Sequence, residues 1–394
     1  MIGFFLNDLG ILCALGSGKQ AIRSGLLSGD RKGLAQTDEF SPGRPLWLGR
    51  VDCALPEIPS ELSVFACRNN RLLLAALRQI QPTVERMIAR FGAQRIGIVL
   101  GTSTSGVRNT EMALRSLSAQ GQFPRAYHYK QQQMGAGADF LAACLGVKGP
   151  AYTISSACSS SGKSLASARR LLNLDLCDAV IVGGADSLCG LTVNGFAALE
   201  SLSSGLCKPF GRNRDGINIG EAATLFVLSR EPGPVRLSGL AATSDAYHFS
   251  APDPTGVAVT QAMRLALDQA GLETRQVDYL NLHGTATLLN DAMESRAVSG
   301  LFGEELAVSS SKGMTGHALG GAAALELGFC WLLLNDGDPE GTLIPNMNDD
   351  ELDDSLPKLN LVKPGQKLRR RINVCQSNSF SFGGSNVSIL VSRT

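Results

Sequence analysis

The sequence predicts an α/β fold in which buried strands alternate with helices. Short apolar runs bounded by glycine recur along the chain, as in 95–106 (RIGIVLGTSTSG) and 177–188 (CDAVIVGGADSL), and segments with helical spacing follow them. Such runs are typical of strands that are buried on both faces of a sheet. Glycine supplies 44 of the 394 residues without forming a low-complexity tract, so we expect it to mark the turns between elements.

The elements follow one another in a regular order. Residues 151–172 predict a strand, a tight turn and a helix, and residues 277–287 and 305–334 repeat this pattern in the second half of the chain. Residues 372–391 predict a β-hairpin with a glycine-rich connection. The segment EPGPV at 231–235 follows a strand that ends in charge, and it divides the chain into an N-terminal half (1–233) and a C-terminal half (234–394).

The composition excludes several classes of function. Lysine and arginine number 36 and aspartate and glutamate 35, which gives a net charge of +1 at pH 7. A chain so balanced has no strong field that would attract nucleic acid or an anionic membrane. No run of eighteen apolar residues predicts a membrane span, and the first twenty residues lack the basic start of a secretory signal. We therefore expect a cytoplasmic protein.

Cysteine and histidine spacing gives no indication of a metal site. The ten cysteines include no CxxC pair, and the four histidines include no HxxxH pair. We expect reduced thiols, most of them buried as small apolar residues.

Cys158 is the cysteine whose position favours chemistry. It lies in SSACSSSGKS, where the predicted strand meets the predicted helix. A thiol at a helix N-terminus faces unpaired N–H groups and the positive end of the helix dipole, and both favour the thiolate. The sequence therefore predicts an activated nucleophile at Cys158.

Two histidines occupy similar positions. His283 follows the apolar strand VDYLNL, and His317 precedes a long Ala/Leu helix. Ends of strands are where α/β folds collect their functional residues. Imidazole N–H groups can hold a thioester carbonyl while negative charge develops on its oxygen. Together with Cys158, the two histidines predict an acyl-transfer enzyme.

A lysine and a glutamate accompany this set. Lys312 lies five residues before His317 among small residues, and it is either solvated or holds a positive charge near the site. Glu326 falls among Ala and Leu on the following helix, where an unpaired carboxylate is costly, so we expect Lys312 to be its partner. The glycine-rich FSFGGSN (380–386) lacks the pattern of a nucleotide loop and predicts a tight turn that approaches the substrate.

At these residues the chain resembles the elongating, decarboxylating β-ketoacyl-acyl carrier protein synthases of the thiolase-like superfamily. The motifs that carry the resemblance stand in family order: LGVKGPAYTISSACSSSG, DAVIVGGADS, RDGINIGEAA, TSDAYHFSAPDP, LNLHGTAT, SSSKGMTGHALGGAAALE and NSFSFGGSN. The resemblance implies a duplicated, five-layered αβαβα fold. It also implies a Cys-His-His set, unlike the Cys-His-Asn set of initiating synthases.

The resemblance implies a ping-pong reaction without a bound cofactor. Cys158 would take an acyl group from the 4'-phosphopantetheine arm of an acyl carrier protein. Malonyl carrier protein would then lose carbon dioxide, and its enolate, held by His283 and His317, would attack the Cys158 thioester to give a β-ketoacyl product.

The resemblance also assigns supporting roles. The N–H groups of Cys158 and Phe382 would form the oxyanion hole, with the Phe382 ring as a gate, and Lys312 and Glu326 would form an ion pair. Further residues that match family positions are Glu294 after the histidine loop, Thr285 and Thr287 at the pantetheine, and Arg68 and Arg71 at the docking site of the carrier protein. Thr104 stands where the family often has a bulky apolar residue that limits the acyl pocket, which would allow a longer or conjugated chain.

Several positions depart from the family pattern. Ser381 replaces a glycine before the gate phenylalanine, and Leu288 replaces a proline after the histidine loop. Ala222 and Thr224 replace glycines, Leu72 replaces a basic residue, and the stretch 202–210 is short. These departures predict a specialised branch, such as the ketosynthases of polyene (including aryl polyene) and aromatic polyketide pathways, rather than a general fatty acid enzyme.

Two other functions are open to the same residues. The chain could be a chain-length-determining partner of another ketosynthase, although such silent partners typically lack the nucleophile that Cys158 supplies. It could also be a thioester hydrolase or acyltransferase, if water or an alcohol reaches the acyl-enzyme. We expect the protein to form a homodimer, or a heterodimer with a ketosynthase-like chain-length partner.

Overall fold

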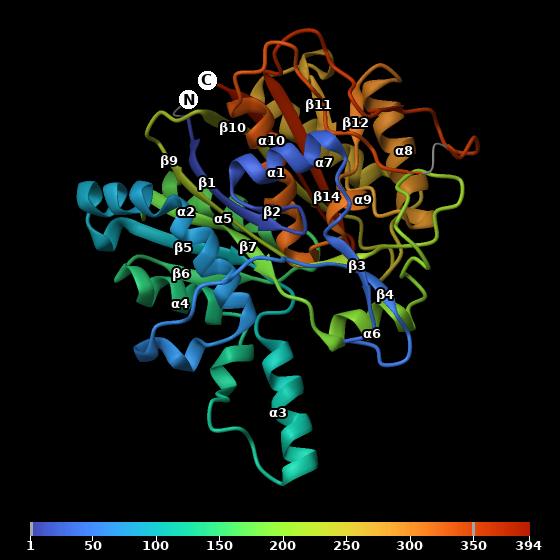
Figure 1. Ribbon diagram of the computed structural model, residues 1–394. Helices are drawn as coiled ribbons and strands as arrows, with labels where there is room; N and C mark the ends of the chain where they lie inside the picture. The colour runs from blue at the N-terminus through green and yellow to red at the C-terminus, as the bar shows by residue number, and fades with distance from the viewer. Residues whose placement is uncertain (1–2, 349–350) are drawn as a thin grey trace.

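The computed structural model describes residues 3–348 and 351–394, and it confirms the predicted alternation of strands and helices (Figure 1). The elements of the first half are β1 (Phe5–Cys13), β2 (Gly16–Ser17), α1 (Lys19–Ser28), β3 (Leu34–Thr37), β4 (Leu46–Gly49), α2 (Arg68–Phe91), β5 (Ile96–Gly101), α3 (Val107–Gln120), α4 (Ala136–Leu145), β6 (Ala151–Ile154), α5 (Ser160–Asn173), β7 (Ala179–Asp186), α6 (Gly190–Ala198), β8 (Ile219–Gly220) and β9 (Ala222–Ser229).

The second half begins with β10 and contains the predicted hairpin as its last two strands. Its elements are β10 (Val235–Ser244), α7 (Val257–Ala270), β11 (Tyr279–Asn281), α8 (Leu288–Phe302), β12 (Ala307–Ser309), α9 (Lys312–Thr315), α10 (Ala322–Asn335), β13 (Asn360–Leu361), β14 (Val374–Ser381) and β15 (Ser385–Arg393).

The two halves repeat one strand pattern. The order in the first half is β1-β9-β7-β5-β6, and in the second half it is β10-β15-β14-β11-β12, followed by β13. In each half the second strand of this order runs antiparallel to both neighbours, and the next three strands are parallel. β1 pairs with β10, so the half-sheets join into one twelve-stranded sheet that also includes β2.

Helices cover this sheet in layers. α5 and α10 contact each other and pack, with residues such as Leu165 and Leu327, in a core that both half-sheets share. α2 and α4 cover the outer face of the first half-sheet, and α7 and α8 cover that of the second. The layers therefore run helix, sheet, helix, sheet, helix, which is the predicted αβαβα arrangement.

The first half carries additions that the second half lacks in the described chain. β3, β4 and β8 form a separate three-stranded sheet, and α3 extends away from the body (Figure 1). On α3, only Ala113 is buried, whereas Met112 and Leu114 are 57% and 52% exposed. Within residues 3–348 and 351–394, no helix has the length and apolar content that crossing a bilayer requires.

Candidate active site

Cys158 lies in the turn between β6 and α5, as the sequence predicts. Ala157, immediately before it, has a positive φ of 50°, so the chain turns sharply into the helix. The helix packs closely on β5, because a Cβ at Gly101 would lie 2.2 Å from the Ser161 nitrogen. A glycine at 101 thus permits the first turn of α5 to sit against the sheet, with Cys158 at its N-terminal end.

The Cys158 thiol is buried and contacts one histidine directly. Its Sγ lies 2.9 Å from the Nε2 atom of His317. Burial raises the pKa of Cys158 to about 12, and the positive charge of Lys312 only partly opposes that rise. Loss of hydration therefore outweighs the helix terminus, which taken alone favours the thiolate. A neighbouring base must take the thiol proton, and His317 is in position to do so.

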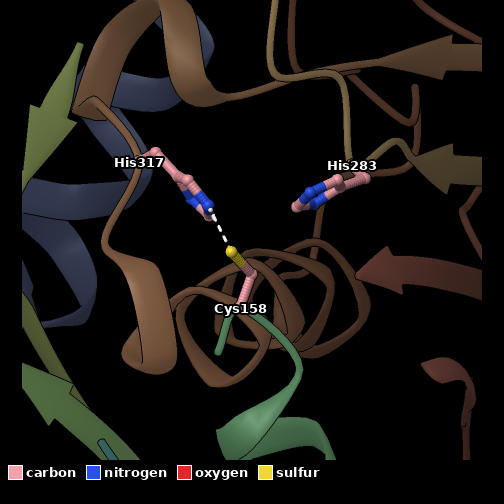
Figure 2. A group of neighbouring side chains, drawn as sticks. All are labelled: Cys158, His283 and His317. Carbon is pink, nitrogen blue, oxygen red and sulfur yellow. Dashed lines mark hydrogen bonds between the residues drawn. The ribbon is translucent and has the colours of Figure 1, made fainter. Parts of the chain in front are cut away.

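The two histidines come from equivalent places in the second half of the fold. His283 follows β11, and His317 lies between α9 and α10. Their rings meet edge to face with centroids 5.4 Å apart, and both point towards the Cys158 sulfur (Figure 2). Burial and the charge of Lys312 hold the pKa of each imidazole well below its usual range. Both rings are consequently neutral at physiological pH, which lets each donate or accept one proton.

Lys312 and Glu326 form an ion pair behind His283. The Lys312 ammonium also donates to the backbone carbonyl of His283 at 2.5 Å, and its Nζ lies 3.5 Å from the His283 Nδ1. Burial raises the pKa of Glu326 to about 7, although the charge of Lys312 works against the rise. A positive charge is thereby fixed close to the histidine ring, inside the protein.

Glu294 holds the histidine loop from the other side. From α8, its carboxylate accepts the N–H groups of His283 (2.8 Å) and Gly284 (2.7 Å). Its side chain is fully buried, and burial raises its pKa to about 7. Glu294 therefore orients the loop backbone and does not reach the Cys158 sulfur through any described hydrogen bond.

A cavity of about 410 Å³ opens onto these groups. It is lined by all three of Cys158, His283 and His317, and by other predicted site residues: Thr285, Thr287 and Phe382. The Phe382 ring packs on that of Phe196 with centroids 5.5 Å apart. A substrate thioester that enters this cavity would meet the thiol, both imidazoles and the Phe382 backbone together.

The same three side chains are the one group in the described chain with metal-ligand geometry. Their ligand atoms lie within 4.8 Å of one another. Two ligands of a tetrahedral zinc ion stand about 3.5 Å apart, given the usual Zn–S and Zn–N lengths. The 2.9 Å contact of Cys158 and His317 is shorter, and the Lys312 ammonium near His283 would repel a cation. This geometry favours shared protons over a bound metal.

Besides Lys312, Glu326 and Glu294, which lie behind the histidine loops, three more predicted site residues are outside this cavity's lining. Thr104 is buried and donates its hydroxyl to the carboxylate of Asp186 at 2.9 Å. Arg68 pairs with the buried Glu221 at 2.5 Å, and Arg71 pairs with the exposed Glu57 at 2.7 Å. The chain uses Arg68 as an internal partner for a buried carboxylate, while Arg71 stays at the surface.

Asp186 is a site residue that the sequence did not reveal. Its buried carboxylate accepts the hydroxyls of Thr102 (2.5 Å) and Thr104, and the N–H of Gly320 (2.6 Å). Gly320 follows His317 by three residues, so Asp186 fastens the His317 loop of the second half to the end of β5 in the first. The one local signal for this role is an acidic residue at the end of an apolar strand, where a buried carboxylate needs hydrogen-bond donors.

Family models match most of the chain. The model described as "Beta-ketoacyl synthase, N-terminal domain" matches residues 51–232, and "Beta-ketoacyl synthase, C-terminal domain" matches residues 235–348. The 3-oxoacyl-[acyl-carrier-protein] synthase 2 of Staphylococcus aureus (strain COL) is 32% identical over 343 residues, which cover 82% of this chain and 81% of that protein. Nodulation protein E of Rhizobium meliloti is 33% identical over 307 residues, covering 75% and 74%.

A solved structure is similar over the whole chain. It is a ketosynthase (ApeO) from Xenorhabdus doucetiae, in complex with its chain length factor (ApeC). The similarity has a TM-score of 0.95 and 43% sequence identity, and it covers 100% of this chain and 98% of that one. The fold expected from the sequence motifs, a duplicated thiolase-like fold, is confirmed.

Proposed function

The chain belongs to the β-ketoacyl synthase family, and from this premise we propose that Cys158, His283 and His317 perform a decarboxylative Claisen condensation on carrier-bound thioesters. The observation that carries the assignment of residues is their convergence on one cavity, with the Cys158 sulfur 2.9 Å from the His317 Nε2. As a member of this family, the protein is a condensing enzyme of fatty acid or polyketide biosynthesis. It takes both substrates on the phosphopantetheine arm of an acyl carrier protein.

The first half-reaction transfers the acyl group to the enzyme. The Cys158 sulfur attacks the acyl carbonyl as its proton passes to His317, and the carbon–sulfur bond to pantetheine breaks. The carrier thiolate leaves and takes up that proton. The N–H groups of Cys158 and Phe382 face the developing oxyanion, and Thr285 and Thr287, which line the cavity, support the arm.

The second half-reaction forms the new carbon–carbon bond. Malonyl carrier protein loses carbon dioxide, and the electrons of the broken bond form an enolate whose oxygen lies between His283 and His317. The enolate carbon attacks the acyl-Cys158 carbonyl and the β-ketoacyl product forms. The sulfur leaves as a thiolate, which takes up a proton from water by way of His317. The Lys312 charge, 3.5 Å from the His283 ring, stabilises the negative oxygen through that ring.

One experiment tests this function directly. Purified protein is mixed with acyl and malonyl carrier proteins, and the carrier-bound products are analysed by mass spectrometry. We expect a β-ketoacyl product and an acyl adduct on the Cys158 peptide. Cys158→Ala should remove both, and Cys158→Gln should retain malonyl decarboxylation only. Elongation by either variant would refute the nucleophile, and a free acid formed without malonyl donor would indicate a hydrolase instead.

We propose that the enzyme serves a specialised polyene or polyketide branch, including aryl polyenes, and acts with a second ketosynthase-like chain. The similar ApeO protein was solved with its chain length factor. In this chain, β6 lies at the end of the sheet and stays half-exposed, and α3, which extends from the body, presents exposed apolar side chains. An uncovered strand edge and an exposed apolar helix face are each suited to contact with another chain.

The assembly has its own test. Co-expression with ketosynthase-like proteins encoded nearby, followed by size-exclusion chromatography with light scattering, should give a dimer of two chains. Met112→Asp with Leu114→Asp on α3 should convert it to monomers. A monomeric native protein would refute the dimer. The retained nucleophile Cys158 supports an active subunit rather than a silent partner.

Two further assignments complete the proposal. The chain divides near residue 233 into two duplicated halves, which is supported by the end of β9 at Ser229 and the start of β10 at Val235. The enzyme acts in the cytoplasm, which is supported by ten cysteines that are all free. Limited proteolysis at the 230–234 connection and cell fractionation test these two points.

A further inference from the structure

A serine hydroxyl joins the Phe382 turn to the helix that carries the nucleophile. Ser381 ends β14, immediately before Phe382, and its Oγ accepts the backbone N–H of Ser159 at 2.6 Å. Ser159 directly follows Cys158 and is the N-cap residue of α5. The bond is shielded, because Ser159 is fully buried and Ser381 is 9% exposed. The neighbours of the two oxyanion-hole residues, 222 positions apart in sequence, are thus bonded to each other.

Backbone hydrogen bonds hold the rest of the Phe382 turn. Gly383 and Gly384 have φ values of 80° and 74°, which fixes a tight hairpin. The Gly383 N–H donates to the carbonyl of Phe249 at 2.9 Å, and the Gly384 carbonyl accepts the N–H of Asp245 at 3.0 Å. The Gly384 N–H also donates to the Ser381 carbonyl at 3.0 Å, which closes the turn itself. The bonds to Phe249 and Asp245 fix its far side, and the Ser381 hydroxyl bonds its near side to the N-terminal end of α5.

The contact has a consequence for the Phe382 amide. Among the described residues, no acceptor receives the Phe382 N–H, and the residue lines the cavity beside Cys158. An amide without an intramolecular partner is available to a substrate oxygen. Its direction is set by the peptide that Ser381 and Phe382 share, and a donor of this kind acts only when it is aimed within a few tenths of an ångström.

We propose that Ser381 is a positioning residue, whose hydroxyl bond to Ser159 fixes the Phe382 N–H opposite Cys158 for attack on the acyl thioester. The proposal rests on the proposed function and deepens it. A glycine at 381 could not make this bond, so the departure from the family pattern at this position adds a connection between the halves. The hydroxyl acts through Phe382 and speeds acyl transfer, whereas loss of carbon dioxide from the malonyl group depends on the two histidines.

The experiment separates the two half-reactions in one set of variants. The acylation rate of the whole protein is measured by rapid quench and intact mass over a range of acyl carrier protein concentrations that reaches saturation. Malonyl decarboxylation is measured in the Cys158→Gln background. We expect Ser381→Ala to slow acylation about tenfold with little change in KM, since a misdirected oxyanion donor costs less than a deleted one. Decarboxylation should stay within twofold, and Ser381→Thr, which keeps the hydroxyl, should restore acylation.

A matched serine in the same hairpin serves as the comparison. Ser385 starts β15 opposite Ser381, and its hydroxyl accepts a hydrogen bond from Lys163, one turn further along α5. If acylation depends on the bond between Ser381 and Ser159 in particular, Ser385→Ala should slow acylation less than Ser381→Ala does. An equal effect of the two variants would show general anchoring of the hairpin and overturn the proposal.

Other outcomes also decide the question. Unchanged or faster acylation in Ser381→Ala would overturn the proposal, as would an equal loss of decarboxylation. Ser381→Gly provides a second deletion of the hydroxyl if the alanine variant does not fold. A native enzyme that forms no acyl-Cys158 at all would instead refute the proposed function, so the two failures are distinguishable.

Discussion

Lys312 and Glu326 form an ion pair in the interior, where their side chains are 1% and 2% exposed. The pair joins α9 to α10, and Lys312 also donates to the backbone carbonyl of His283. One buried cation therefore connects the loops of both histidines. Burial of the Lys312 ammonium costs hydration free energy, and this cost is offset only while the Glu326 carboxylate is present.

Breaking this pair should destabilise the protein. Lys312→Met leaves the Glu326 carboxylate buried without a counter-charge, and we expect a loss of about 3 to 5 kcal/mol in the free energy of unfolding. The double variant Lys312→Met/Glu326→Leu should recover much of that loss and still be inactive in condensation. Urea denaturation and product analysis measure the two effects. Equal stability of the single and double variants would contradict the assignment.

The two histidines should differ in which half-reaction they support. His317 contacts the Cys158 sulfur at 2.9 Å, so His317→Ala should slow enzyme acylation by roughly 10² to 10⁴, as expected for loss of a general base. His283 makes no described hydrogen bond to the thiol, and His283→Ala should slow malonyl decarboxylation more than acylation. Rapid-quench acylation and carbon dioxide release provide the measurements. Identical profiles for the two variants would argue against separate roles.

The reactivity of Cys158 should depend on pH in a way that reveals its base. Because the pKa of the thiol is raised to about 12, its thiolate fraction grows about tenfold per pH unit below that value. In His317→Ala, iodoacetamide labelling of the Cys158 peptide should therefore rise steeply from pH 7 to 9. In the native protein the neutral His317 takes the proton throughout this range, and labelling should change little. When the titration is continued to about pH 10.5, labelling that levels off above about pH 9.5 in the variant would show a thiol of ordinary pKa.

Substitutions of Arg68 and Arg71 should differ in their effect on stability. Arg68→Ala removes the partner of the buried Glu221 carboxylate and should lower the free energy of unfolding by about 3 kcal/mol. Arg71 pairs with an exposed glutamate, and Arg71→Ala should change stability by less than about 1 kcal/mol.

A comparison of substrates then tests docking at Arg71. Arg71→Glu should raise the KM for acyl carrier protein and leave the KM for an acyl N-acetylcysteamine thioester unchanged, because only the carrier contacts the surface. A parallel rise for both thioesters would exclude a role in docking.

Local sequence patterns predicted the immediate setting of the nucleophile. The strand, turn and helix expected in 151–172 are β6 and α5, and the hairpin expected in 372–391 is β14 and β15. These elements depend on neighbouring residues, since apolar periodicity, small residues and glycines set them within one segment. The positions of Cys158 and the turn at Phe382 followed from them.

Contacts between segments far apart in the chain could not be predicted from local sequence patterns. Arg68 has its partner Glu221 at a separation of 153 residues, and no local feature distinguishes such an arginine from a surface one. Burial of Cys158 arises from the second half packing onto α5, so a prediction based on the helix terminus alone overestimated the thiolate. The bond of Ser159 to Ser381 likewise exists only once the halves have met.

The central place of β1 in the sheet has a consequence for biosynthesis. Its neighbours are β9, which begins at Ala222, and β10, which begins at Val235. A ribosome that adds roughly 5 to 20 residues per second needs on the order of 10 to 40 s to reach β9 after completing β1. During that interval the strand Phe5–Cys13 lacks its two long sheet partners and can pair only with the two-residue strand β2 at its end. Until β9 and β10 have been synthesised, α2, which packs on β1 in the folded chain, is the long element already available to cover this strand.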